Sequence, residues 1–97
     1  MNKIFNSSQL YFIENYFAVV DNVSMMVTKD RLKNIGINIK SERLRRGISQ
    51  EELAEKCDIS RNSVSLIETG KINPTILRVV DIARELKVDI ASLVKGV

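Results

Sequence analysis

The chain has no histidine, no tryptophan and a single cysteine among its 97 residues, and these absences exclude several kinds of site. Without histidine, neither a Cys/His zinc site nor a Ser-His or Cys-His nucleophile pair can be assembled. One cysteine cannot form an internal disulfide, which fits a reducing cytoplasm. We therefore expect a cytoplasmic protein with no bound metal, no cofactor and no enzymatic activity.

A long hydrophobic run is also missing. The apolar stretch 10–13 ends at Glu14, and the apolar stretch 16–20 ends at Asp21. Neither approaches the roughly 20 apolar residues that span a membrane. We expect no membrane contact, and no small-molecule ligand is evident.

Aromatic residues and charge are unevenly distributed along the chain. The net charge is +3, and residues 1–28 hold only Lys3 against Glu14 and Asp21, so the positive surplus belongs to the remainder. A mild basic surplus favours phosphate contacts. The aromatic residues, by contrast, all precede residue 18: Phe5, Tyr11, Phe12, Tyr16 and Phe17. These shifts predict an N-terminal extension over residues 1–28 and one domain over residues 29–97.

The extension permits two local structures. Ser7 or Ser8 can cap a helix over residues 8–20, which is the structure we favour. Alternatively, the runs 16–20 and 23–27 are rich in β-forming residues and flank Asp21-Asn22, which suits a two-residue hairpin turn.

Helical spacing begins at Asp30 and continues to Arg46. Leu32, Ile35, Ile39 and Arg43 recur at steps of three and four, so they share the inward face. A second helix opens at Ser49, where Glu52 completes a capping box. Its inward residues are Leu53, Ala54 and Cys57, and Asp58-Ile59 forms the turn that follows.

Ser60 opens a third helix that ends at Gly70. Val64 and Ile67 point inward, and Glu68 follows Val64 by four residues, so it faces inward as well. The opposite face carries Arg61, Asn62, Ser65, Leu66 and Thr69. A short polar row of this kind is typical of side chains that read base edges in the DNA major groove.

The last part of the chain predicts two more helices. Asn73 as a cap and Pro74 at the first helical position start the fourth helix, and Asp89 caps a short fifth helix. The apolar positions of the fourth helix are Ile76, Val79, Val80, Ala83 and Leu86. Those of the final segment are Val88, Ile90, Leu93 and Val94.

A combination of residues at fixed spacing runs through residues 35–96. It consists of Ile39, Arg43, Gly47, Ser49-Gln50-x-x-Leu53-Ala54, Ser60, Val64, Ile67-Glu68-x-Gly70, Pro74 and Ala83-x-x-Leu86-x-Val88. Together these resemble the phage-repressor and Cro type of helix-turn-helix, the XRE family, which includes restriction-modification controllers, plasmid regulators and antitoxins. The resemblance implies an all-α, five-helix domain that binds double-stranded DNA, usually as a two-fold homodimer.

The sequence departs from this family in three places. The aromatic-rich residues 1–28 have no counterpart in the minimal domain. Lys87 stands where a glycine is common, and Leu66 places an aliphatic residue where polar readers often lie.

Candidate DNA contacts follow from chemistry and position. Arg61 can bind guanine or a phosphate, Asn62 matches adenine, and Ser65 can serve either role. Leu66 can meet a thymine methyl group or pack on the domain. The resemblance gives Gln50 a phosphate contact, and flanking backbone contacts are expected from Lys71, Asn73 and Thr75.

Two further sets of residues are expected to be structural. The family pairs Arg43 with Glu68 in a partly buried ion pair, consistent with their inward spacing. A dimer interface is expected from Tyr11, Phe12, Tyr16, Phe17, Val88, Ile90, Leu93 and Val94, because clustered apolar side chains mark contact surfaces.

The sequence therefore predicts a DNA-binding transcriptional regulator. The alternative is a protein-interaction module, an antitoxin or adaptor, that works through the aromatic N-terminal segment.

Overall fold

The computed structural model describes residues 28–97. Within this range the chain forms five helices and no strand, as predicted from the sequence. The first helix covers residues 28–45 and is followed by α2 (Gln50–Cys57), α3 (Arg61–Glu68), α4 (Ile76–Leu86) and α5 (Ile90–Val94). The helix or hairpin expected before residue 28 lies outside the described residues. None of the helices in the described range is long and apolar enough to cross a membrane.

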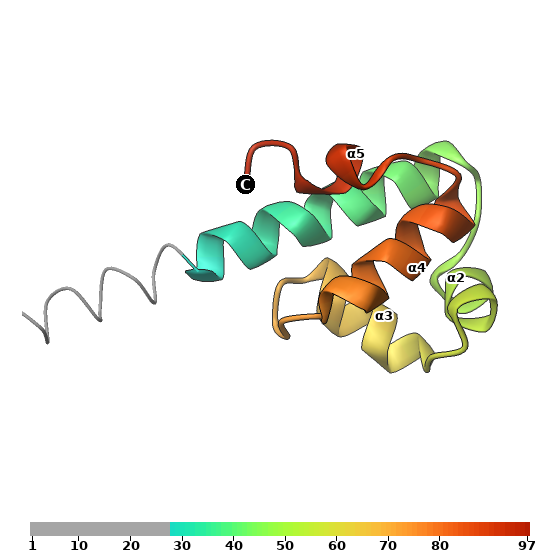
Figure 1. The fold of residues 1–97 in the computed structure, drawn as a ribbon. Coiled ribbons are helices and arrows are strands. Elements are labelled where there is room, and N and C mark those ends of the chain that lie inside the picture. The colour runs from blue at the N-terminus through green and yellow to red at the C-terminus, as the bar shows by residue number, and fades with distance from the viewer. Residues whose placement is uncertain (1–27) are drawn as a thin grey trace, which may run out of the picture.

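The helix over residues 28–45 is the longest element, and the other helices pack around its C-terminal part. In Figure 1, α5 and the end of the chain lie along one side of this helix, and α2 and α3 lie on the other side. Two asparagines hold the end of the chain in place. Asn38 donates from Nδ2 to the carbonyl oxygens of Leu93 and Lys95, at 3.0 and 2.9 Å, and Asn34 donates to that of Gly96 at 3.3 Å.

The helix-turn-helix pair α2 and α3 begins at two serine caps. The Ser49 hydroxyl accepts from the backbone N–H of Glu52, and the Ser60 hydroxyl accepts from that of Ser63, each at 3.0 Å. Such caps satisfy amide groups that the first helical turn leaves unpaired. The Ser49 hydroxyl also donates to the Glu52 carboxylate at 3.5 Å, so Glu52 contacts the side chain of the cap residue. Asp58 adopts the left-handed conformation, with φ 55°, and ends α2.

The start of α4 differs from the predicted one. Thr75, not Asn73, is the N-cap, and its hydroxyl accepts from the backbone N–H of Arg78 at 3.2 Å. Pro74 therefore precedes the helix. Both Asn-Pro and Thr are good helix starts, and the chain uses Thr75. Ile76, one of the apolar positions of the predicted helix, is 67% exposed, and Ile82 is buried.

The core consists of aliphatic side chains from every helix of the described range. Its fully buried members are Ile39, Leu53, Val64, Ile82, Leu86 and Leu93. Burial of Leu93 corrects its assignment to the dimer interface, because a side chain with 0% exposure in the monomer has no surface to offer a second copy. The five-residue α5 is too short for its spacing to separate inward from outward positions.

Gly36 brings the helix 28–45 and α3 into direct backbone contact. A Cβ atom at this position would lie 2.6 Å from the carbonyl oxygen of Ile67 and would also overlap that of Glu68. Only glycine permits this approach. Gly70 makes a second close contact, since a Cβ there would lie 2.8 Å from the Cα of Lys33. Together, the two contacts fix the C-terminal end of α3 against the long helix.

Candidate nucleic-acid interface

The eight residues of α3 divide into two sides. Val64, Ile67 and Glu68 are buried, with 1%, 3% and 5% exposure. Arg61 and Asn62 are exposed, and Ser65 and Leu66 are half-buried. The helix therefore rests on the core by one side and presents a short polar surface by the other, as its spacing predicts.

Arg61 and Asn62 occupy the first turn of α3, directly after the Ser60 cap. Within residues 28–97, the Arg61 guanidinium forms no ion pair, so its hydrogen-bond donors are directed to solvent. A free guanidinium and a free amide at a helix start have the donor and acceptor sets that match guanine and adenine edges. The two side chains lie next to each other on an exposed helix end.

Toward the C-terminal end of α3, the side chains of the exposed side are less accessible or already form hydrogen bonds. Leu66 is half-buried, so part of its surface packs on its own domain. The Thr69 hydroxyl donates to the backbone carbonyl of Ser65 at 2.8 Å, which occupies its proton and leaves the oxygen as an acceptor. Thr69 is therefore not a free donor toward an acceptor such as a phosphate oxygen.

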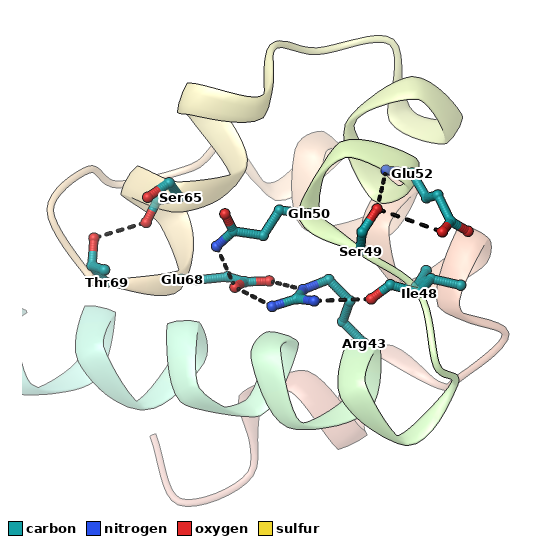
Figure 2. A network of polar contacts seen from close by, with 8 residues as sticks. All are labelled: Arg43, Ile48, Ser49, Gln50, Glu52, Ser65, Glu68 and Thr69. Carbon is teal, nitrogen blue, oxygen red and sulfur yellow. Dashed lines mark hydrogen bonds and ion pairs between the residues drawn. The ribbon is translucent and has the colours of Figure 1, made fainter.

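Behind α3 lies a network of charged and polar side chains, drawn in Figure 2. Arg43 binds the Glu68 carboxylate with two bonds, Nε to Oε2 at 2.7 Å and Nη2 to Oε1 at 3.1 Å. The two side chains are 7% and 1% exposed, so the pair is buried. Two parallel bonds from one guanidinium fix both partners in orientation as well as in position.

Gln50, the first residue of α2, joins this network. Its Nε2 donates to Glu68 Oε1 at 3.0 Å, and the side chain is half-buried. Arg43 also donates from Nη1 to the carbonyl oxygen of Ile48 at 2.9 Å, in the turn before α2. The ends of three helices thus meet at one carboxylate, and this fixes the start of α2 relative to the end of α3.

The loop between α3 and α4 follows the candidate reading helix. Lys71, Asn73 and Thr75 are exposed, as expected for residues that contact a DNA backbone. Thr75 also serves as the cap of α4, so its hydroxyl oxygen already accepts one bond. Gly70 permits the sharp exit from α3 through its φ of +72°.

Cys57 is a core residue at the end of α2, 7% exposed. Burial raises the pKa of its thiol, and the nearby Glu85 and Asp81 carboxylates raise that pKa further. The thiol is therefore protonated at neutral pH, and this matches a packing role. Arg78 donates to the Cys57 carbonyl oxygen at 3.2 Å and so ties α4 to the end of α2.

Several positions that shape the interface are not predicted from the sequence. Gly36 sets the distance between the long helix and α3, and Asn34 and Asn38 hold the C-terminal segment. The sequence signals at these three positions are present but weak. A glycine and two asparagines inside a helical pattern each lower helix propensity, which often indicates a packing or hydrogen-bonding role.

The expected dimer residues are distributed over exposed and buried positions. Ile90 and Val94 are 36% and 40% exposed, Val88 is half-buried, and Leu93 is in the core. Tyr11, Phe12, Tyr16 and Phe17 lie outside the described residues. The described part therefore offers a small apolar surface at α5, formed by Val88, Ile90 and Val94.

A family model and two curated regulators match this chain. A family model described as helix-turn-helix matches residues 39–93. An uncharacterised HTH-type transcriptional regulator, y4dJ of Sinorhizobium fredii, is 32% identical over 65 residues, which are 67% of this chain and 84% of that protein. An uncharacterised HTH-type transcriptional regulator of Archaeoglobus fulgidus is 36% identical over 55 residues, 57% of this chain and 79% of that protein.

Two crystal structures share the fold. The hypothetical transcription factor NHTF from Neisseria has a TM-score of 0.65 and 30% identity, over 69% of this chain and 77% of its own. The restriction-modification controller protein C.AhdI from Aeromonas hydrophila has a TM-score of 0.62 and 27% identity, over 64% of this chain and 94% of its own. With the capped helix pair, the polar outer side of α3 and a family match over more than half of its length, this chain belongs to the XRE-type helix-turn-helix family of DNA-binding transcriptional regulators.

Proposed function

We propose that this chain is a sequence-specific regulator that inserts α3 into the major groove of DNA. The observation that carries the proposal is the division of α3, whose buried side is held by the core and the Arg43–Glu68 pair. Its other side carries exposed Arg61 and Asn62 and half-buried Ser65 and Leu66. A helix held in this way is pre-organised to present side chains to base edges.

Arg61 and Asn62 supply sequence preference in this proposal. A bidentate Arg–guanine or Asn–adenine contact discriminates against a wrong base by about 1–3 kcal/mol. Gln50 and the exposed residues of the following loop, Lys71, Asn73 and Thr75, bind the backbone and set the register.

The active unit in this proposal is a two-fold dimer. It places two copies of α3 about 34 Å apart, which requires an approximately palindromic operator. Residues 29–97 form the DNA-binding domain, and residues 1–28 contribute Tyr11, Phe12, Tyr16 and Phe17 to the contact with the second copy. The exposed apolar surface of Val88, Ile90 and Val94 supports a contact at α5.

Selection of duplexes from a random library, followed by binding measurements over a range of salt, tests the DNA proposal. We expect recovery of a palindromic sequence whose affinity falls steeply with salt, because phosphate neutralisation releases counterions. Failure to recover any duplex at low salt contradicts the proposal.

Sedimentation of two variants tests the dimer. We expect deletion of residues 1–28, and separately Ile90→Asp, to weaken self-association and operator affinity while helical content is retained. Dissociation constants identical to that of the full chain mean that these surfaces do not join two copies.

The second candidate function, a protein-interaction module, is favoured by two adjacent apolar side chains at the start of α4. Ile76 and Leu77 are 67% and 71% exposed, an unusual pair for a solvent-facing helix end. A tight complex with another protein that survives Arg61→Ala but does not form with Leu77→Asp supports this function over DNA binding.

A further inference from the structure

A row of lysines follows one side of the helix 28–45. Lys29, Lys33 and Lys40 are spaced by four and seven residues, which keeps their side chains on one helix face. All three are exposed, and none forms an ion pair with another residue in the described range. We call these three residues the lysine row.

Two backbone contacts fix the position of the lysine row beside α3. Gly36, between Lys33 and Lys40, packs against the last carbonyl groups of α3. Gly70, two residues after the end of α3, lies so close to Lys33 that a Cβ would come within 2.8 Å of the Lys33 Cα and N. Figure 2 shows Thr69, the residue between α3 and Gly70, directly above the long helix. The row therefore flanks the end of α3 and the start of the loop with Lys71.

Few acidic groups of the part of the chain that the structure describes compensate the charge of the lysine row. The two buried carboxylates of this region, Glu42 and Glu68, already pair with Arg45 and Arg43. Asp30, the acidic residue nearest in sequence, forms no ion pair with the row. The other acidic residues within 28–97 lie on α2 and its turn or on α4 and the start of α5: Glu51, Glu52, Glu55, Asp58, Asp81, Glu85 and Asp89. The lysine row thus forms a positively charged edge beside the end of α3.

We infer that the lysine row binds phosphates of the duplex that α3 reads, and so extends the backbone contact from the helix-turn-helix onto the helix 28–45. This inference rests on the proposed function. The two ends of the row, Lys29 and Lys40, are eleven residues apart, about 16 Å along the helix, a length comparable with the roughly 12 Å width of the major groove. Lysine suits this role, because it binds phosphate as a mobile point charge without demanding a fixed geometry.

A pair of double variants with the same net charge tests the inference in the full-length chain. The first is Lys29→Gln with Lys33→Gln. The control is Lys56→Gln with Lys87→Gln, because both residues line a pocket with Glu85 and Leu86 at the far end of α4. Eleven residues of α4, about 16 Å, separate that end from the loop that follows α3. Glutamine matches lysine in helix propensity at the helical positions 29, 33 and 56, and at Lys87, the left-handed cap of α4, it is again an unbranched side chain, so we expect both variants to fold.

Affinity for the selected duplex is measured from low to moderate salt. For the row variant we expect the slope of log affinity against log salt to become shallower by about 0.9 for each phosphate that the variant no longer neutralises. Preference between the operator and an unrelated duplex should stay unchanged, since phosphate contacts carry no sequence information. The control should keep the wild-type slope, and Lys40→Gln alone should make the slope shallower by about 0.9, the value for a single phosphate.

Three results overturn the inference. The first is a row variant that keeps the wild-type slope while wild-type protein binds DNA, which leaves the proposed function standing. The second is an equal change in the row and control variants, which assigns the effect to net charge. The third is wild-type protein that binds no duplex, which removes the proposed function and this inference together.

Discussion

Gln50 donates a hydrogen bond to Glu68 across 3.0 Å, joining the first residue of α2 to the last residue of α3. The accepting oxygen, Oε1, also receives a bond from Arg43 at 3.1 Å. Gln50, for which we propose a phosphate contact, is therefore held by the same carboxylate that anchors α3 to Arg43. Under the proposed function, Glu68 links the position of the backbone contact to that of the base contacts.

Gln50→Ala should weaken binding to all duplexes by a similar factor, because its amide supports the backbone contact and reads no base. It should also lower the free energy of unfolding by about 1–2 kcal/mol, since Glu68 loses one of its partners. Titration of the operator and of an unrelated duplex checks the first effect, and urea unfolding checks the second. A change in which operator is preferred contradicts this assignment.

Arg61→Ala and Asn62→Ala should relax sequence preference, each at one base pair, by about 1–3 kcal/mol. Both side chains are exposed, so the free energy of unfolding should stay within about 0.5 kcal/mol of the wild-type value. Repeating the duplex selection with each variant identifies the relaxed position. A variant that loses stability and keeps its operator shows that the side chain faces the domain.

Arg43→Ala and Glu68→Ala should each destabilise the domain by about 3–5 kcal/mol, because each leaves a buried charge without its partner. The double variant should cost less than the sum of the single variants, since no unpaired charge remains. A double-mutant cycle measured by urea unfolding gives the coupling. Strictly additive losses of stability mean that the two side chains do not interact in solution.

Gly36→Ala should destabilise the domain by about 1–3 kcal/mol, because the added methyl group overlaps the backbone of α3 and forces the two helices apart. Ser41→Ala is the matched control, an exposed site on the same helix, and should change stability little. Operator affinity should fall with Gly36→Ala as α3 shifts. Equal stabilities of the two variants would show that the helices tolerate a wider spacing.

Much of this architecture is predictable because local and long-range signals agree. The serines before α2 and α3 are caps by sequence and by geometry, and the glycine after α3 adopts the positive φ that its position suggests. The inward positions of Arg43 and Glu68 follow from four-residue steps alone. Spacing identifies inward positions reliably when a helix has a strong apolar stripe.

The failures occur where local signals compete or are too short. Asn73-Pro74 and Thr75 are both good helix starts by sequence, and the structure begins α4 after Thr75. In α5, five residues do not define a stripe, so the surface position predicted for Leu93 is wrong. From the sequence alone, Gly36 is only a residue of low helix propensity inside a helix. Its role follows from the close contact with the backbone of α3, which the sequence does not reveal.

The division of α3 into a buried and an exposed side has an evolutionary consequence. Val64, Ile67 and Glu68 are buried and stabilise the fold, and Arg61, Asn62 and Ser65 do not belong to the buried core. Natural selection can therefore substitute Arg61, Asn62 and Ser65 one at a time, with little loss of stability at each step. For a regulator of the proposed kind, a duplicated gene can acquire a new target site through a few surface substitutions while its scaffold stays under separate constraint.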